Sequence, residues 1–414
     1  MNAAKKRAAL IAAVGIGALS LTSCAGAAVN MGGSDGGAVE EIVIGALHPL
    51  SGASAVDGQQ MSHAAQMAVD EINAAGGIAC LDGAELVLEA TDTKGEPETG
   101  QSEATRLIQE GATALVGSYQ SATSANIAAV AERNGIPFVM DVSALDSILE
   151  QGYTYSFRTQ PSGGMMGERA AQFLKEIADE SGTDVSTIGF LYEQGNYGAS
   201  VYDAFSAEAE KLGMTVTNAI SYDPASSDLS TQVQQAVAGG ADVLAVTGYY
   251  RDGLLISQAI DSIGPDVQAV YGVANGGYDQ EQFITDAPNG GEGYLNANYS
   301  IDVTNDRAQK VTADFETEFG EPMRTSAALT YDGVAMIAEA IETACSADPD
   351  AIRDAIADTK YVPIVVNDGP VKFDKTGQNE NATVSVVQVQ DGQLNTVFPN
   401  ELAEADFVFP APVK

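Results

Sequence analysis

Histidine and cysteine are scarce in this chain, and their scarcity excludes several classes of active site. Among 414 residues there are two histidines, His48 and His63, and three cysteines. Neither histidine stands in a metal-ligand spacing with a cysteine. The single G-x-S-x-G match, at residues 32–36, stands in a Gly- and Ala-rich segment and not at a strand-to-helix turn, so it predicts no nucleophile elbow. The histidines suggest no Ser-His-Asp order. The sequence therefore predicts no metal centre and no cofactor.

A phosphate-binding lysine is missing from the one segment that resembles a nucleotide loop. Residues 95–102, GEPETGQS, match G-x-x-x-x-G-K-[ST] except at Gln101, where the lysine should stand. Glu96 and Glu98 add negative charge that repels phosphate. We interpret this segment as a turn followed by a helix that begins near Pro97. These absences favour a binding protein over an enzyme.

Basic residues are also few. The chain has 19 lysines and arginines against 57 aspartates and glutamates, which gives a formal net charge of −38. A surface of this charge repels nucleic acid and anionic lipid headgroups. We expect no nucleic-acid partner.

The N-terminal segment has the pattern of an export signal. Three basic residues at 5–7 precede an apolar run over 8–21, which is shorter than the roughly 20 residues that span a bilayer. Residues 21–24, LTSC, resemble a bacterial lipobox, which predicts that 1–23 are removed and that Cys24 is lipidated. A plain secretory signal is the alternative, and it also predicts export. The Gly- and Ala-rich residues 24–40 predict a flexible tether.

Two further cysteines, Cys80 and Cys345, lie far apart in the sequence. In an exported protein they can form a disulfide. The alternative is two unrelated buried thiols, because spacing alone does not bring the sulfurs together.

Strand and helix patterns alternate from Glu41 onward. Short apolar runs such as 113–117 and 241–248 are each followed by segments with apolar residues at helical spacing. This alternation predicts parallel sheets covered by helices. The length exceeds that of one compact domain and suits two. The end of the chain alternates with a two-residue period, and Asp391-Gly392 predicts a β-hairpin.

The loops between these strands and helices are rich in hydroxyls, amides and glycine. Loops that follow parallel strands gather at one edge of the sheet, where ligands bind at helix N-termini. We expect Ser121 to cap the helix that it begins. Six loops have this composition, over 47–58, 117–126, 140–145, 192–200, 247–253 and 272–279.

The chain resembles the type I periplasmic binding proteins of the branched-chain amino-acid (leucine/isoleucine/valine) transporter group. The resemblance covers residues 41–400 in order. It rests on the segments IGALHPLSG…MAVDEINAAGGI, ALVGSYQSATSANIAAVAERNGIPFV, FRTQPS, NYG, TGYYRDG, YDGVAMIAEAI and GPVKFDKTGQN.

The resemblance implies two doubly wound α/β lobes joined by three crossings. It places residues 41–157 plus 297–368 in lobe 1 and residues 158–296 plus 369–405 in lobe 2. It implies capture of an amino acid or a similar small polar molecule in the cleft and delivery to an ABC permease with its ATPase. The protein is then a monomer, lipid-anchored at the outer face of the cytoplasmic membrane. A ligand-sensing subunit, or an importer component for an amide, urea-like or carboxylate solute, is the alternative.

The resemblance also implies the ligand contacts. Ser121 corresponds to the residue that binds the ligand carboxylate, and the adjoining Tyr119 and Gln120 belong to the same loop. Ser143 and Ala144 fall in the next loop, although the threonine usual there is absent. Tyr197 and Tyr249 match the lobe 2 tyrosines that close over the ligand.

Two positions depart from the family pattern. Asn275 falls where amino-acid binders often have an acid for the ligand ammonium. Asp57 falls where the family often has an aromatic residue in the side-chain pocket. Asp57 either takes over the ammonium or faces solvent at the mouth of the cleft. Because a buried ammonium needs a charged partner or several acceptors, both departures bear on ligand identity.

Overall fold

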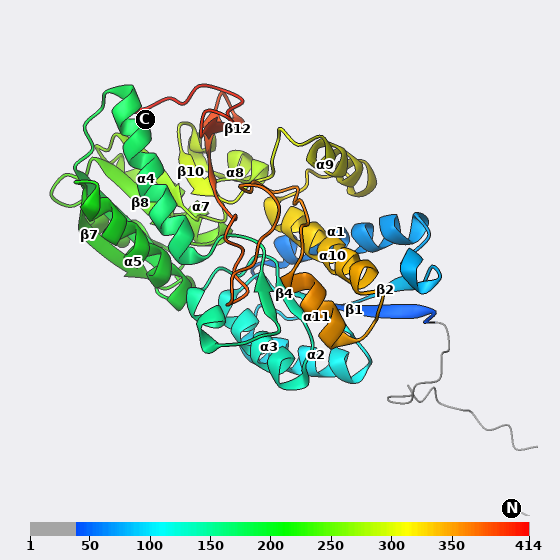
Figure 1. Ribbon diagram of the computed structural model, residues 1–414. Helices are drawn as coiled ribbons and strands as arrows, with labels where there is room; N and C mark the ends of the chain where they lie inside the picture. Colours follow the sequence, from blue (N-terminus) through cyan, green and yellow to red (C-terminus); the bar gives the residue numbers. More distant parts are fainter. Residues whose placement is uncertain (1–38, 414) are drawn as a thin grey trace, which may run out of the picture. The chain divides into compact units, whose positions relative to one another are not determined.

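The computed structural model describes residues 39–413 and contains two β-sheets (Figure 1). The predicted signal peptide, Cys24 and most of the tether lie outside the described residues. The first sheet has the strand order β2-β1-β3-β4-β5, and its strands span Glu85–Asp92, Glu41–His48, Ala114–Gly117, Phe138–Met140 and Ser156–Arg158.

All pairings in the first sheet are parallel, which confirms the expected architecture. Ile42 and Ile44 of β1 pack against one pair of helices, and Leu47 and Leu115 pack against the other pair. Alternate residues of a strand point to opposite faces, so both faces of this sheet are buried. The two pairs are α1 (Ala55–Ala74) with α10 (Thr325–Ala344), and α2 (Pro97–Gln109) with α3 (Ser121–Asn134). The helix that begins at Pro97 is as predicted.

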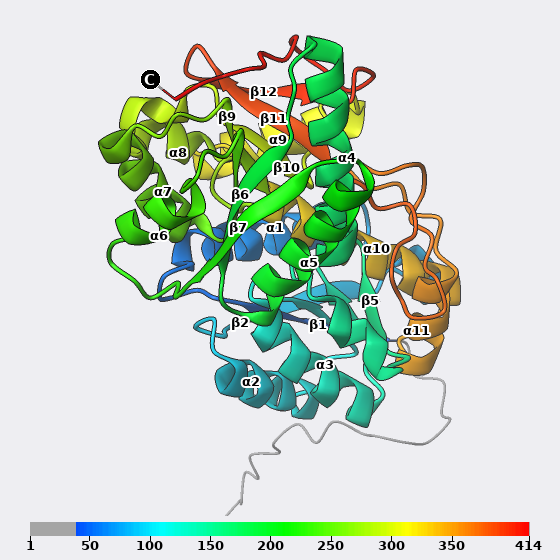
Figure 2. The ribbon, with the colours of Figure 1, turned by 90° about the vertical axis from the view of Figure 1, so that its left-hand side faces the viewer.

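The second sheet has seven strands in the order β12-β11-β10-β9-β8-β6-β7 (Figure 2). Only β11 runs antiparallel, against β10 and β12, and the turn at Asp391-Gly392 joins β11 to β12 as the hairpin signal predicted. In sheet order, the strands span Gln393–Phe398, Ser385–Gln390, Leu295–Asn298, Ala269–Val273, Val243–Thr247, Thr187–Glu193 and Thr215–Tyr222.

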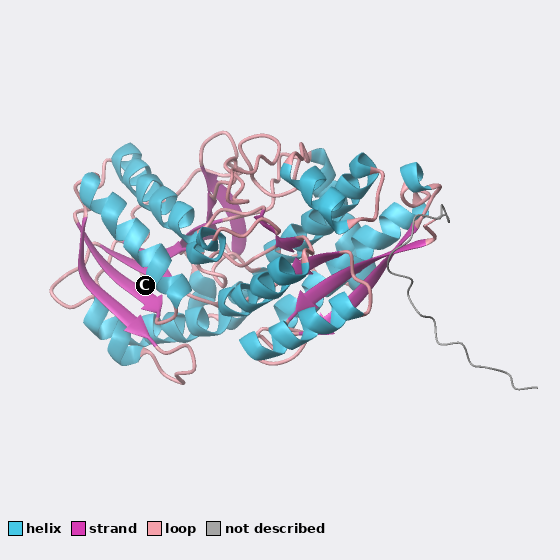
Figure 3. Ribbon diagram, turned by 60° about the horizontal axis from the view of Figure 1, so that its bottom comes forward, coloured by secondary structure: helices cyan, strands magenta, loops and turns pink. Residues whose placement is uncertain are grey.

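Helices cover the second sheet on both faces, as they do the first (Figure 3). One face carries α4 (Gly163–Ser181) and α5 (Asn196–Lys211). The other carries α6 (Ser230–Ala236), α7 (Tyr250–Ile263) and α8 (Glu281–Asp286). Three short 3₁₀ helices span Ala79–Leu81, Asp146–Gln151 and Pro288–Gly291.

Helix α4 was not expected from the sequence, because its first turn is rich in glycine. Ser162 caps it by accepting a hydrogen bond from the Met165 amide. Gly167 permits the close approach of α5, since a Cβ there would lie 2.4 Å from the Val201 carbonyl oxygen. Residues 159–162 alone lie between β5 and α4, and they form the first of the connections between the two sheets.

The chain passes between the sheets three times. It crosses after β5, again between β10 and α9 (Asp306–Phe319), and finally between α11 (Pro349–Ala357) and β11. Isolated bridges join these segments, for example Arg158 to Gln378 and Ile301 to Val365. The predicted lobe boundaries, 41–157 with 297–368 and 158–296 with 369–405, stay a prediction.

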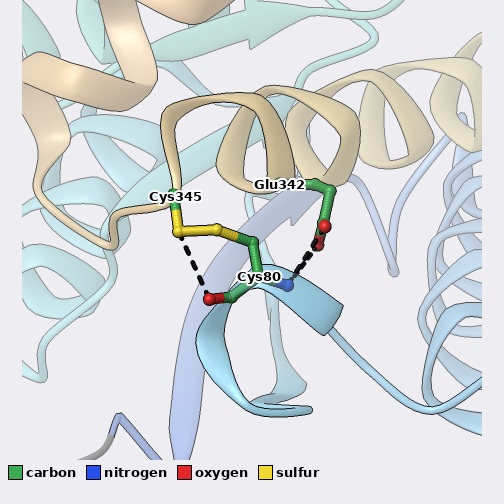
Figure 4. The surroundings of a disulfide bond; sticks show 3 residues. All are labelled: Cys80, Glu342 and Cys345. Carbon is green, nitrogen blue, oxygen red and sulfur yellow. Dashed lines mark hydrogen bonds between the residues drawn. A yellow bond between two sulfur atoms is a disulfide. The ribbon is translucent and has the colours of Figure 1, made fainter.

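A disulfide joins Cys80 to Cys345 (Figure 4). The Cα atoms are 5.4 Å apart although 265 positions separate the residues. Cys80 lies in the 3₁₀ helix that follows α1, and Cys345 caps the C-terminus of α10, so the bond links that short helix to the end of α10. Glu342 accepts a hydrogen bond from the Cys80 amide at 3.0 Å. Of the two alternatives left open by the sequence, the structure contains the bonded pair.

Two searches of residues 39–413 gave negative results. No helix in this range is both long enough and apolar enough to cross a membrane. No group of three or more His, Cys, Asp or Glu side chains in the same range is arranged to hold a metal ion.

Candidate functional site

Loops from both sheets meet around two small neighbouring cavities, each of about 20 Å³. We call the first the serine cavity; it is lined by Tyr119, Ser121, Val142, Ala144, Tyr197, Gly248, Tyr249, Gly276 and Tyr299. We call the second the arginine cavity; it is lined by Asp57, Tyr119, Gly276, Asp279, Gln280, Asn298, Tyr299, Arg324, Thr325 and Ser326. Six of the nine predicted ligand contacts therefore line one cavity or the other.

Ser121 lies at the start of α3, but it does not cap the helix as predicted. Gln120 occupies the cap position, and no side chain makes a capping hydrogen bond. The Ser121 hydroxyl oxygen instead accepts hydrogen bonds from the amides of Ala144 and Leu145, each at 3.3 Å. The prediction was wrong because it used only the residues next to Ser121 in the sequence, whereas the amides that Ser121 binds belong to the loop after β4. Ser121 thus orders the loop after β4 beside the serine cavity.

Side chains from β5 and the first crossing between the sheets also hold the loop after β4 in place. The Ser143 carbonyl accepts from the Gln160 side chain at 2.8 Å, and the Leu145 carbonyl accepts from the guanidinium of Arg158 at 2.5 Å. The Ser143 hydroxyl is buried without a partner and does not line either cavity, whereas Ala144 lines the serine cavity. The loop therefore presents Ala144, and not Ser143, to the site.

Four tyrosines from both lobes surround the serine cavity. The ring centroid of Tyr249 lies 5.7 Å from that of Tyr197 and 6.0 Å from that of Tyr119. Tyr197 donates its hydroxyl to the Ala274 carbonyl at 2.5 Å. Burial raises the pKa of Tyr119, Tyr249 and Tyr299 well above the usual value, so their hydroxyls stay protonated and can donate. Tyr299 is a lining residue that the sequence reasoning missed.

Asp57 lines the arginine cavity and is 4% exposed, so the structure excludes the second of the two alternatives, exposure to solvent at the mouth of the cleft. Its carboxylate pairs with the Arg324 guanidinium at 2.9 Å. Burial raises the pKa of Asp57, and the nearby Arg324 opposes that rise. Arg324, at the start of α10, is a site residue that the sequence reasoning missed, because 267 positions separate it from Asp57.

Asn275 and Gln120 line neither cavity. The Asn275 side-chain oxygen accepts from the amides of Gly277 and Tyr278 at 2.9 and 3.3 Å, so it folds the loop after β9. The Gln120 side chain donates to the Ser54 hydroxyl at 3.0 Å and joins two lobe 1 loops. In the structure both residues shape the loops that carry the site.

A buried acid that the sequence reasoning did not name lies four positions after Asn275. Asp279 lines the arginine cavity and accepts a hydrogen bond from the Asn298 side chain at 2.9 Å. Burial raises the pKa of Asp279 to about 7, with a smaller contribution from the charge of Asp57. Asp279 ends the loop GVANGGYD, which the sequence analysis singled out, but the sequence does not show that its side chain points into the cavity.

Larger cavities lie elsewhere. One of about 840 Å³ lies between the end of α7, the turn after α8 and the C-terminal segment, and it contains none of the predicted residues. A groove of about 400 Å³ adjoins the arginine cavity and shares Asp279, Gln280, Arg324 and Thr325 with it. The convergence of the loops, and not cavity size, identifies the candidate site.

The buried carboxyls predict that stability increases as the pH is lowered from 8 to 5. Burial raises the pKa of Asp252 to about 6 and that of Asp279 and Asp332 to about 7, against a usual value of 3.8. Because these folded-state values exceed the unfolded ones, the stabilisation is present at low pH and is lost as the pH rises through 6 to 7. Asp92 and Asp242 have a lowered pKa, so they stabilise the fold while they are ionised. Their contribution is lost only when the pH falls through those lowered pKa values, which lie below this range.

Thermal unfolding measured at half-unit pH steps, at constant ionic strength, tests this expectation. The midpoint should increase steadily from pH 8 to pH 5. A midpoint that is constant or decreases over that range would contradict it.

Comparisons with known proteins identify the family to which the sequence is similar. The family model described as "Periplasmic binding protein" matches residues 41–393. The chain is 32% identical to "Leu/Ile/Val-binding protein homolog 8" of Brucella abortus, over 90% of this chain and 94% of that protein.

Solved structures share the fold. The branched-chain amino acid transporter substrate binding protein LivJ of Streptococcus pneumoniae, in complex with isoleucine, superposes with a TM-score of 0.75 at 23% identity, covering 89% of this chain and all of that one. A solute binding protein of Rhodopseudomonas palustris in complex with 3,4-dihydroxy benzoic acid gives a TM-score of 0.75 at 19% identity, covering 89% and 98% of the two chains. At these identities the likeness concerns the fold.

Proposed function

Because this chain belongs to the periplasmic binding protein family, we propose that it is the solute-binding component of an ABC importer. It captures an amino acid or a similar small polar molecule between its two lobes. It then delivers the solute to a permease driven by an ATPase. The function is binding and release, with no catalytic step.

The observation that carries this proposal is the meeting of Ser121 and Ala144 with Tyr197 and Tyr249 around one cavity. The first two follow strands of the first sheet and the last two follow strands of the second sheet. A ligand in contact with both sets stabilises the closed arrangement of the lobes, because it binds that arrangement more tightly than an open one.

The serine cavity suits the carboxylate of an amino acid. The N-terminus of α3 begins at Ser121, and a helix N-terminus attracts anions through its free amides and its dipole. The tyrosine hydroxyls supply further donors at the same place. Relatives carry leucine, isoleucine and valine in their names, which supports an amino-acid ligand in this chain.

The location follows from the N-terminal pattern. We propose that the mature protein is exported, monomeric and tethered by lipid on Cys24 to the outer face of the cytoplasmic membrane. Mass spectrometry of the membrane fraction tests the anchor, since a lipid-free Cys24 reduces the segment to an ordinary export signal.

Calorimetric titration with the twenty amino acids tests the function. We expect one or more of them to bind with micromolar affinity or better, and the double variant Ser121→Ala/Tyr197→Ala to weaken that binding at least about 30-fold through lost hydrogen bonds and ring contact. The variant Ser102→Ala, on the exposed face of α2, serves as the matched control. Unchanged affinity in the folded double variant would contradict the proposed site. Chemical conversion of the bound solute would contradict a function of binding alone.

A further inference from the structure

The arginine cavity differs from the serine cavity in its side chains. Its lining contains no aliphatic side chain longer than the methyl group of Thr325. The remaining lining side chains are two carboxylates, one guanidinium, two amides, one serine hydroxyl and two tyrosines. A leucine-type side chain placed here would desolvate these polar groups without offering them a hydrogen bond.

The charges in this cavity do not cancel. Asp57 and Arg324 neutralise each other through their 2.9 Å ion pair. Asp279 forms no ion pair with a residue in the described part of the chain, and its one hydrogen bond there comes from the neutral side chain of Asn298. The cavity lining therefore has one more carboxylate than it has cations, and the charge of Arg324 offsets the rise in the pKa of Asp279 only in part.

Two buried polar atoms on the cavity wall also lack partners. The side-chain oxygen of Gln280 and the hydroxyl of Ser326 are without hydrogen bonds, on residues that are 9% and 7% exposed. Gln280 donates its amide NH₂ to the Gly276 carbonyl, which leaves its oxygen as an acceptor only. The Asp279 carboxylate and the Gln280 oxygen can only accept, and the Ser326 hydroxyl can accept as well as donate. A ligand group that donates hydrogen bonds therefore complements these three groups.

The geometry separates the two ends of a ligand. Tyr119, Gly276 and Tyr299 line both cavities and so form the wall between them. In an α-amino acid the carboxylate and the ammonium are bonded to one carbon, so both stay on the serine side of this wall. The arginine cavity therefore receives the far end of the side chain. The adjoining groove of about 400 Å³ gives a long side chain further room.

We propose that the ligand is an amino acid whose side chain ends in a cation, an ammonium or a guanidinium, that pairs with Asp279 in the arginine cavity. This inference rests on the proposed function and names its substrate class. Asp57 and Arg324 are positioning residues that line the cavity with fixed polar groups, and Gln280 and Ser326 accept further hydrogen bonds from the same cation. Side chains with aliphatic ends are excluded by the desolvation that they impose.

Matched ligands test this proposal. Titration calorimetry at pH 8.5, where the Asp279 carboxyl is ionised, compares L-lysine with L-norleucine, which has a methyl group in place of the terminal ammonium. L-arginine is compared with L-citrulline in the same way, and L-leucine completes the set. We expect lysine or arginine to bind at least about 30-fold more tightly than its neutral counterpart, because a hydrogen bond between charged groups is stronger than one between neutral groups.

A matched pair of variants locates the effect. Asp279→Asn should remove the preference for the cation, whereas Asp266→Asn, on the exposed surface of the same lobe, should preserve it. Tight binding of leucine with no binding of lysine or arginine overturns the inference but leaves the amino-acid function standing. Tight binding of citrulline alone overturns it in favour of an amide-type ligand. Binding of no amino acid at all overturns both proposals.

Discussion

Replacing Asp332 with alanine is expected to lower the free energy of unfolding by about 4 kcal/mol. Asp332 lies in α10 and is 1% exposed. Its carboxyl accepts from the Tyr361 hydroxyl at 2.7 Å and from the Ile364 amide at 2.9 Å. Alanine leaves both donors buried without an acceptor, and each orphaned group costs about 1–3 kcal/mol.

Asp332 also connects α10 to the segments where the chain crosses between the two sheets. Ile364 precedes Val365, which forms the bridge to Ile301 at the second crossing. Denaturant unfolding of Asp332→Ala and Asp332→Asn measures the effect, and the asparagine variant, which retains one oxygen acceptor, should lose less. Asp314→Ala on the exposed face of α9 removes only a surface ion pair and should change the free energy by less than about 1 kcal/mol. A loss below about 1 kcal/mol for Asp332→Ala would contradict the assigned role.

Replacing Gly377 with alanine should be nearly as costly, at about 3–4 kcal/mol. Gly377 has a φ of +88°, and a Cβ there would lie 2.2 Å from the Ser156 carbonyl oxygen. The left-handed conformation costs a residue with a Cβ about 1–2 kcal/mol, and forcing an extra methyl group into packed structure adds about 1–3 kcal/mol. The backbone must move at the contact between the first and third crossings, where the Gly377 carbonyl accepts from the Arg158 amide at 2.8 Å.

Gly392→Ala is the matched control for this substitution. Gly392 has a φ of +73° in the turn between β11 and β12, and a Cβ there meets no atom within 4 Å. Gly392→Ala should lower the free energy of unfolding by about 1–2 kcal/mol, which is the cost of the left-handed conformation alone. The difference between the two variants in denaturant unfolding then measures the close backbone contact at the hinge. Equal losses would show that this contact does not constrain the protein.

The ligand site could be predicted only in part from the sequence. Five predicted residues line the cavities because each lies in a loop, or in the first turn of a helix, that follows a parallel strand, and such segments meet at one edge of the sheet. They are Ser121, Ala144, Tyr197, Tyr249 and Asp57. Asn275 belongs to such a loop as well, but its side chain folds back onto the backbone. Membership of a loop is a local property, whereas the direction of a side chain depends on its neighbours in space.

The groups that determine ligand charge were not predictable in this way. Arg324 follows an irregular segment late in the chain and reaches Asp57 only because α10 packs against α1 (Figure 1). Asp279 is one of 57 acidic residues, and nothing in its sequence marks it as buried. Burial and charge pairing over such separations are properties of packing alone.

The α/β class, the parallel strands, the hairpin at Asp391-Gly392 and the loops that meet at the candidate site were all predictable from the sequence. These features follow from local periodicity, because a strand or helix that buries one face must repeat apolar residues at its own spacing. The pairing of Asp57 with Arg324, and the lack of an ion-pair partner for Asp279 among residues 39–413, depend on tertiary packing. The physical reason is that the energy of a charge depends on burial and on the nearest opposite charge, and distant segments supply both.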